Sequence, residues 1–257
     1  RDVLADDGTL WLNIGDSYAA NRSYQVPSTK GGTKHGPGQA VGGKSSVVPV
    51  GLKPKDLIGI PWLLAFALRA DGWYLRQDII WHKPNPMPES VRDRCTKAHE
   101  YVFLLSKSER YFFDAEAMKE PSAQPERAGK LERSFSTGKP DAVLRQDVGR
   151  AVMRTETRNR RSVWTVATRP YKGAHFATFP PALIEPCILA GSRPGDIVLD
   201  PFMGSGTTAA VALQHGRQYL GCELNAEYGA LQAERINEAT EAAACAAAQP
   251  DLFERAA

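Results

Sequence analysis

The 257-residue chain is 42% hydrophobic and 24% charged, which fits one large or two small soluble domains. No run of about 20 apolar residues occurs, and the first residues do not resemble a signal peptide, so no membrane segment is predicted. The four cysteines lie singly without Cys-x-x-Cys spacing, which indicates reduced thiols, a cytoplasmic setting and no structural zinc. The net charge of +3 is mild, so a nucleic-acid interface must be argued from local clusters.

The chain opens with a turn and a strand, followed by a long polar stretch. Residues 9–14 are predicted to form a core strand after the turn at residues 6–8. Residues 21–55 are rich in Gly, Ser, Lys, Pro and Thr, which predicts a mobile loop. The loop is either a disordered connector or a cationic flap that closes over DNA phosphates. Because the chain begins so abruptly with a core strand, we expect it to be part of a longer protein.

A helix and two strands are predicted next. Pro61 fits the first position of a helix that continues to Leu68 and stops at residues 71–72. This segment is apolar nearly all round, so we expect the helix to be buried. Strands are predicted at residues 73–81 and 100–105.

The two strands are joined by a proline-rich loop at residues 82–88. Alternating prolines exclude regular structure there and stiffen the chain. Since the loop carries Lys83 and Asn85 at the end of a strand, it suits the wall of a DNA-binding site. The alternative is a rigid crossing on the surface.

Residues 114–162 lose apolar periodicity and gain charge, which predicts an inserted region. Arginine pairs bidentately with guanine or phosphate, so the insert is a candidate for target recognition, the alternative being a solvated polar excursion. The arginines that we expect to contact DNA are Arg154, Arg158, Arg160 and Arg161.

A strand, a glycine-rich turn and a helix follow one another near the end of the chain. Residues 196–199 have the length and branching of a buried parallel strand, and residues 209–213 begin a helix. Gly204 and Gly206 between them carry no Cβ, so the backbone can turn tightly and approach a ligand. This order places backbone N–H groups and a positive helix end beside that ligand.

A second strand-like run at residues 218–222 ends in Glu223, roughly 20 residues after the glycines. A carboxylate at this spacing is placed to accept both hydroxyls of an adenosyl ribose. The glycine pattern is not the full dinucleotide fingerprint, and no Gly-Lys-Ser/Thr follows it, so a phosphate-binding P-loop is not expected.

The phrase Asp-Pro-Phe-Met-Gly-Ser-Gly-Thr-Thr at residues 200–208, with Gly-Cys-Glu-Leu-Asn at residues 221–225, resembles motifs I and II of β-class DNA amino-methyltransferases. The resemblance covers nearly the whole chain in a permuted order. It implies an α/β, Rossmann-like methyltransferase fold, with a twisted, mostly parallel sheet, helices on both faces and an antiparallel strand near one edge. It also implies that S-adenosyl-L-methionine is bound by Asp200, Pro201, Phe202, Gly204, Ser205, Gly206, Thr207 and Glu223.

Residues 175–181 resemble motif X of the same family, whose backbone and aromatic ring help to wall the cofactor pocket. His175 and Phe179 are therefore expected at the cofactor. Cys187 invites comparison with the nucleophile of cytosine-C5 methyltransferases, but it falls in an apolar helix just before the glycine turn. We interpret it as an ordinary buried cysteine.

The activity implied is methyl transfer from S-adenosylmethionine to an exocyclic amine of double-stranded DNA, cytosine N4 or adenine N6, in a bacterial restriction-modification or phage modification system. The target base must leave the duplex stack. An RNA or protein methyltransferase, and a catalytically incomplete partner that binds cofactor and DNA, remain alternatives.

The family's motif IV, Ser/Asp/Asn-Pro-Pro-aromatic, does not occur in the chain, whose only Pro-Pro is at residues 180–181. The catalytic residues are therefore unknown. We expect the chain to be part of a longer enzyme or to need a second chain, and to be inactive alone.

The expected organisation divides the chain into four parts. Residues 1–113 are the remainder of the catalytic half, and residues 114–162 are the recognition insert. Residues 163–240 form the S-adenosylmethionine-binding half, and residues 241–257 form a tail. The tail carries a peptide from Gln249 to Phe253 that resembles a short sliding-clamp-binding motif, with its apolar pair at the end.

Overall fold

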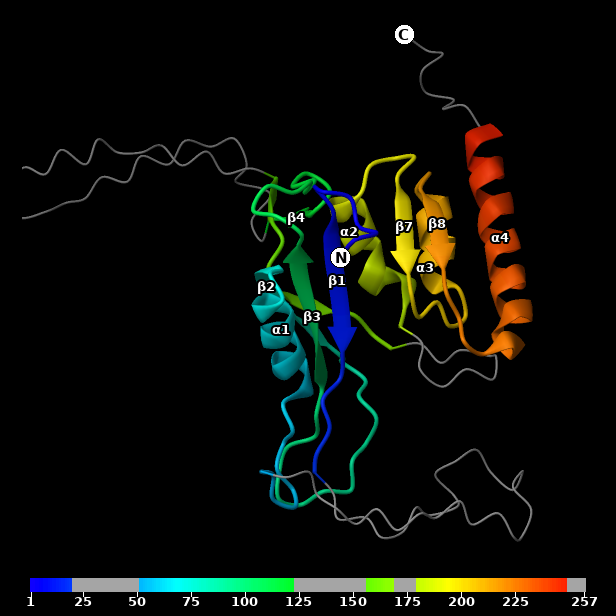
Figure 1. Cartoon of the computed structure of the whole chain (residues 1–257). Helices are drawn as coiled ribbons and strands as arrows, with labels where there is room; N and C mark the ends of the chain where they lie inside the picture. Colours follow the sequence, from blue (N-terminus) through cyan, green and yellow to red (C-terminus); the bar gives the residue numbers. More distant parts are fainter. Residues whose placement is uncertain (20–50, 123–155, 169–178, 249–257) are drawn as a thin grey trace, which may run out of the picture.

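The computed structural model describes residues 1–19, 51–122, 156–168 and 179–248 (Figure 1). In chain order the helices and strands are β1 (Thr9–Ile14), α1 (Ile60–Ala70), β2 (Tyr74–His82), β3 (His99–Ser106), β4 (Lys119–Pro121), β5 (Thr157–Asn159), β6 (Val163–Thr165), α2 (Pro181–Gly191), β7 (Ile197–Asp200), α3 (Thr207–Gln214), β8 (Gln218–Gly221), the short 3-10 helix η4 (Ala226–Tyr228) and α4 (Gly229–Ala248). The strands and helices predicted with clear apolar patterns are confirmed, with ends shifted by one or two residues.

The main sheet has four strands in the order β1-β3-β2-β6. β3 is antiparallel to both β1 and β2, and β6 is parallel to β2. β7 and β8 form a separate parallel pair. Figure 1 shows β1 and β7 pointing the same way, so the carboxyl ends of β1, β2, β7 and β8 meet at one edge of the molecule. This is the edge at which ligands bind in α/β folds.

The alternation of side chains along β3 explains why helices cover both faces of the main sheet. Successive residues of a strand point to opposite faces. Phe103 and Leu105 pack with Ala65 of α1 on one face, whereas Val102 packs with Leu183 of α2 on the other. The α/β fold with helices on both faces is thus confirmed.

The prediction that α1 is buried all round was wrong. Leu63 is 60% and Phe66 46% exposed, although Pro61 and Ala65 on the opposite side are buried. Only the side of α1 that faces β3 meets the sheet, and the guanidinium of Arg69 lies over the Phe66 ring on the other side. An apolar composition therefore did not by itself indicate that this helix lies between two layers.

Two small features inside and after the expected insert had not been predicted. β4 and β5 pair as an antiparallel ribbon at its two ends, and β6 extends the main sheet beside the end of β2. Each of these strands has only three residues, which is too short for a period-two pattern to be recognised. The insert between β4 and β5, residues 123–155, lies outside the described residues.

Both ends of the expected loop at residues 21–55 meet at the start of α1. The Ala19 N–H donates to Asp56 O at 2.8 Å, and the Lys55 N–H donates to Ala19 O at 2.7 Å. Asp16 Oδ1 accepts from the N–H groups of Gly59 and Ile60 at 2.9 and 3.0 Å, which satisfies donors at the beginning of the helix. Residues 20–50 themselves lie outside the described part.

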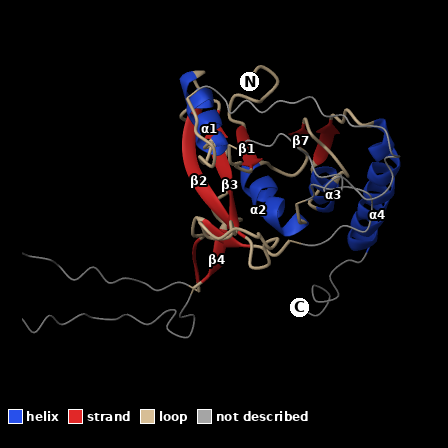
Figure 2. Cartoon of the chain, turned by 90° about the horizontal axis from the view of Figure 1, so that it is seen from below, coloured by secondary structure: helices blue, strands red, loops and turns tan. Residues whose placement is uncertain are grey.

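The β7–β8 pair is covered on one face only. Val198 of β7 packs with Ile188, Val211 and Ala212 of α2 and α3, and Figure 2 shows α2, α3 and α4 in a row beside the pair. On the opposite face Ile197, Leu199 and Leu220 are exposed, and no described residue covers them.

None of the helices in the described ranges has both the length and the apolar character that a membrane span requires.

Cys187 lies in the core between α2 and the main sheet, as interpreted from the sequence. Burial raises the pKa of its thiol far above the usual value. Since the thiolate is the reactive form of cysteine, a raised pKa keeps this side chain protonated and unreactive at mildly alkaline pH. We therefore expect iodoacetamide under these conditions to modify the exposed Cys95 and Cys222 but to reach Cys187 only after denaturation.

Peptide mass spectrometry with and without urea measures this directly. Modification of Cys187 at the same rate as Cys95 in the native chain would contradict the packing of α2 against the sheet.

Candidate functional site at the carboxyl ends of the strands

The turn between β7 and α3 requires glycine at two positions. Gly204 has φ 53° and Gly206 has φ 81°, in the left-handed region that residues with a side chain rarely adopt. The Gly206 N–H donates to Met203 O at 2.9 Å and closes the turn. Helix α3 then begins at Thr207, so the turn and the amino end of the helix face the same edge of the molecule.

Asp200 holds the shape of this turn with both of its carboxylate oxygens. Oδ1 accepts from the Phe202 N–H at 2.9 Å, and Oδ2 accepts from the Thr208 hydroxyl at 2.5 Å. These bonds link the end of β7 to the first turn of α3. Asp200, predicted as a cofactor-binding residue, therefore lies where it orders the backbone that a ligand would meet.

Glu223 meets the glycine turn from the neighbouring strand. Its Oε2 accepts from the Gly204 N–H at 2.8 Å, and its Oε1 accepts from the Asn225 N–H at 2.8 Å. A backbone bond from Met203 N–H to Cys222 O at 2.9 Å ties the two segments together. The acid and the glycines, 19 positions apart in the sequence, are thus in direct contact.

The close approach of the turn to β8 explains a third glycine. A Cβ on Gly221 would lie 1.8 Å from Met203 Sδ and 2.9 Å from Met203 Cγ. Met203 is buried against the strand at this point. Because Gly221 has no side chain, Met203 of the glycine turn can pack directly against β8. Glu223 follows two residues after Gly221.

Two apolar side chains at the turn and directly after Glu223 are exposed. Leu224 is fully exposed, and Phe202 is 87% exposed. Sites for small molecules are mostly apolar with a few placed polar groups, and these side chains provide such a surface beside Glu223. Leu224 was missed from the sequence, although an apolar residue directly after the acid was the available signal.

The other residues predicted to bind the cofactor fall in different places. Pro201 is exposed at the turn, whereas Ser205 and Thr207 are buried behind it. Phe179 packs against the core cluster that contains Leu183. His175 lies outside the described residues.

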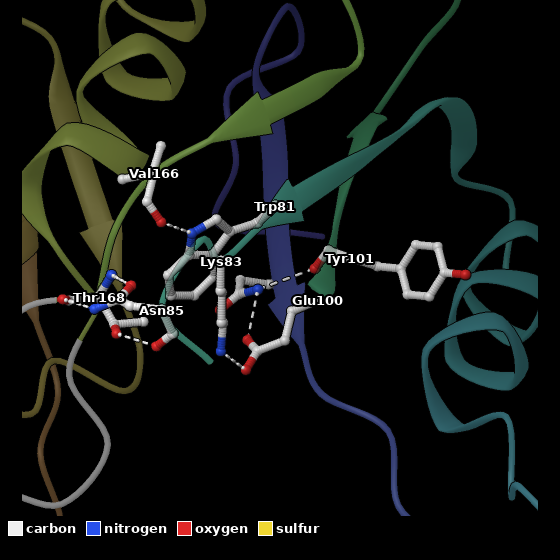
Figure 3. Close-up of polar contacts among 8 residues, drawn as sticks. Trp81, Lys83, Asn85, Glu100, Tyr101, Val166 and Thr168 are labelled. Atoms are coloured by element: carbon white, nitrogen blue, oxygen red, sulfur yellow. Dashed lines mark hydrogen bonds and ion pairs between the residues drawn. The ribbon is translucent and has the colours of Figure 1, made fainter. Parts of the chain in front are cut away.

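A second polar cluster lies where β1, β2 and β3 meet (Figure 3). Lys83 donates to Glu100 Oε1, and its ammonium lies 4.2 Å from the centre of the Trp81 ring. Asn13 Nδ2 donates to Glu100 Oε2 at 3.3 Å and to Tyr101 O at 3.0 Å. Glu100 thereby joins the ends of three strands.

Asn85 fastens the proline-rich loop to the segment after β6. Its Oδ1 accepts from the Thr168 N–H at 3.0 Å, and its Nδ2 donates to Thr168 O at 2.9 Å, as Figure 3 shows. Lys83 and Asn85, predicted to bind DNA, are both engaged within the protein. They hold the loop in place at the same edge as the glycine turn.

The arginines predicted to bind DNA lie on and after the β4–β5 ribbon. Arg158 and Arg161 each donate through Nε to Glu120 Oε1 at 2.9 Å, and Arg160 lies 4.7 Å from the centre of the Trp164 ring. Burial of Glu120 raises the pKa of its carboxyl, but hydrogen bonds from Arg161 and Arg158 outweigh this and hold it below its usual value. Arg154 lies outside the described residues.

The structure does not bring these arginines together with the glycine turn. Figure 1 shows β4 toward the edge at which β7 begins, whereas β7 ends toward the opposite edge.

Comparison with known proteins identifies close relatives. Residues 1–234 match the family described as DNA methylase. The type II methyltransferases M.XycI of Xanthomonas campestris pv. cyanopsidis and M.Cfr9I of Citrobacter freundii are 52% and 51% identical over 237 residues. Each alignment covers 92% of this chain and 67% of the relative, so the chain spans about two thirds of the length of these relatives.

Solved structures share the fold at lower identity. The PvuII DNA methyltransferase (cytosine-N4-specific) is 18% identical with a TM-score of 0.55, covering 93% of this chain and 69% of the other. TTHA0409 from Thermus thermophilus, solved with S-adenosyl-L-methionine, is 22% identical with a TM-score of 0.54, covering 93% of this chain and 72% of the other. These similarities confirm the predicted Rossmann-like methyltransferase fold.

Proposed function

The chain belongs to the DNA methylase family, and from that premise we propose how its two polar clusters divide the work. The reaction is transfer of a methyl group from S-adenosylmethionine to an exocyclic amine of DNA, cytosine N4 or adenine N6. We assign cofactor binding to the turn between β7 and α3 together with Glu223. We assign one wall of the target-base site to the proline-rich loop that Lys83 and Asn85 hold.

One contact carries the first assignment, namely the bond from the Gly204 N–H to Glu223 Oε2. It places a carboxylate that can accept from ribose hydroxyls beside the backbone of the glycine turn. Leu224 directly after the acid and Phe202 within the turn add exposed apolar surface. A nucleoside needs this combination, because its sugar requires acceptors and its purine ring requires apolar contact.

The second assignment rests on the rigidity and position of the loop at residues 83–88. Lys83 is paired with the half-buried Glu100, and Asn85 makes two bonds to the Thr168 backbone. β2, which leads into the loop, points to the same edge as β7 (Figure 1). A flipped base entering this edge meets a fixed surface, which favours alignment of its amine with the methyl group.

The acceptors for the amine hydrogens belong to motif IV in this family, and that motif does not occur in residues 1–257. We therefore expect the chain to bind cofactor but to require further polypeptide for methyl transfer. The proposed source is a segment of the same enzyme or a second chain.

Two measurements test these proposals. Isothermal titration with S-adenosylhomocysteine tests the cofactor site in the chain itself. Transfer of labelled methyl groups to duplex DNA is then measured for the chain alone and after adding the part of M.XycI that it does not cover. The proposal expects binding in the first assay and methylation only in the complemented reaction. Methylation by the chain alone would refute the need for further polypeptide. Cofactor binding without methylation in either reaction would favour the catalytically incomplete DNA-binding partner.

We further propose that the arginines of the ribbon bind DNA phosphates. Replacing both Arg158 and Arg161 by Gln is expected to weaken binding similarly on all sequences. A plot of log K against the logarithm of the salt concentration should become shallower by about 1 for each phosphate that is no longer neutralised. Fluorescence anisotropy on a labelled duplex at several salt concentrations measures the slope.

The matched control is Arg69→Gln, which removes the same kind of charge from the exposed side of α1. The control removes one charge and the double variant removes two. A change of slope in the control that is half that of the double variant would therefore mean that only the net charge matters, and the ribbon would lose its assigned role.

We also propose a location and a further partner. The proposed location is the cytoplasm of a bacterial or phage-infected cell, where the DNA substrate would lie. The peptide from Gln249 to Phe253 lies outside the described residues, and its binding to a sliding clamp is tested by pull-down with Leu252→Ala and Phe253→Ala. Equal retention of both variants and the parent chain would exclude the motif.

A further inference from the structure

The beginning of helix α4 contacts the buried side of the glycine turn between β7 and α3. Figure 1 shows that α4 begins at the edge where β7 and β8 end and runs back along them. Gln232 Nε2 donates to Gly204 O at 2.8 Å. Arg235 Nη1 donates to Ser205 Oγ at 2.9 Å and also to Thr207 Oγ1. These side chains thus reach three separate points along the turn.

The backbone of α4 also packs against the turn. A Cβ on Gly206 would lie 3.5 Å from Gln232 Cα, which is an ordinary van der Waals distance. The helix therefore leaves room for a side chain at this point, and it is the φ of 81° that favours glycine at position 206.

The contacting residues form one face of α4. Gln232, Arg235 and the buried Ala239 are spaced by three and four residues, so they share a side of the helix. Glu234 and Asn237 are exposed on the other side. The helix therefore directs two polar side chains, Gln232 and Arg235, toward the turn.

We propose that Gln232 and Arg235 are positioning residues of the cofactor site, an inference that rests on the proposed function of the glycine turn. Ser205 and Thr207 are only 3% and 5% exposed, so Arg235 lies behind the turn and acts through it. By binding both hydroxyls, Arg235 fixes the backbone between them, and Gln232 fixes the Gly204 carbonyl. The turn and Glu223 beside it are then held in the shape that the ligand meets, and binding requires no further ordering of the loop.

The structure also indicates which substitution should restore part of this function. The guanidinium of Arg235 reaches both hydroxyls from a single nitrogen. A lysine ammonium has three donors but a flexible stem, so Arg235→Lys retains some of the bonds with less order. Methionine has a similar apolar stem and no donor. Arg235→Met therefore removes the bonds while keeping much of the packing.

The experiment compares S-adenosylhomocysteine binding by titration calorimetry in the whole chain and its variants, at a temperature where circular dichroism shows each to be folded. We expect Arg235→Met to weaken binding by about tenfold or more, because two hydrogen bonds from a charged group are removed. Arg235→Lys should recover part of the affinity, and Gln232→Leu should weaken binding several-fold. The amide NMR signals of Gly204 and Gly206 should shift in Arg235→Met, whereas that of Gly72 should not.

The matched control is Glu234→Met, which removes a charge from the exposed side of the same helix. It should bind S-adenosylhomocysteine like the unmodified chain. An unmodified chain that binds no S-adenosylhomocysteine would overturn the proposed function and this inference with it. Normal binding by both the unmodified chain and Arg235→Met would overturn the inference alone. Weakened binding in Arg235→Met that Arg235→Lys does not improve, with unchanged glycine signals, would also overturn it.

Discussion

Replacement of Glu223 by alanine is expected to lower the affinity for S-adenosylhomocysteine by about 100-fold, or about 2.7 kcal/mol. Hydrogen bonds to a charged group contribute about 1.5–3 kcal/mol each, and a ribose offers two hydroxyls to this carboxylate. The substitution also removes the acceptor for the N–H groups of Gly204 and Asn225, so the turn loses a bond on its ligand side. Titration calorimetry on the chain and the variant measures the change.

Glu227→Ala is the matched control, because Glu227 is exposed in η4, four positions further along. It should bind like the unmodified chain. If Glu223→Ala bound S-adenosylhomocysteine within about threefold of the parent, the sugar would have to be held elsewhere and the cofactor site would be misassigned.

Replacement of Gly204 by valine is expected to abolish detectable cofactor binding. A β-branched side chain at φ 53° costs about 1–3 kcal/mol in backbone strain. In addition, the new side chain stands where the backbone must approach the ligand. The bond from the Gly204 N–H to Glu223 cannot keep its geometry if the backbone relaxes to relieve the strain.

The variant Gly195→Val is a control that introduces backbone strain without crowding the proposed ligand site. Gly195 has φ +87°, and a Cβ there meets nothing within 4 Å. Both variants should melt at a lower temperature, but only Gly204→Val should fail to bind S-adenosylhomocysteine. Loss of binding in both would show that general destabilisation, rather than the glycine turn, was responsible.

Local sequence patterns were sufficient for the parts of the fold that repeat or turn in characteristic ways. The strand at residues 9–14 and the helix that begins at Pro61 carry apolar residues over enough positions for their type to be recognised. The glycines and Glu223 could be connected because one strand–turn–helix unit fixes the distance between them. Their contact at 2.8 Å follows from that geometry.

The features that were missed depend on pairs of residues far apart in the chain. Arg158 and Arg161 bind Glu120, 38 and 41 positions away, and no local pattern links these residues. Lys83 was expected to face DNA, but its partner Glu100 lies on the next strand. Arg235 was not predicted as a site residue, and its partner Ser205 lies 30 positions earlier in the chain.

The bare face of the β7–β8 pair has a practical consequence for work with the isolated polypeptide. Among the described residues, β7 pairs only with β8. The other edge of β7, next to Ile197 and Leu199, therefore presents main-chain N–H and C=O groups that pair with no described strand. Such an edge is a template for strands of other molecules. Concentrated stocks should therefore self-associate and bind hydrophobic dyes, and a polypeptide that docks there should act as a solubilising companion.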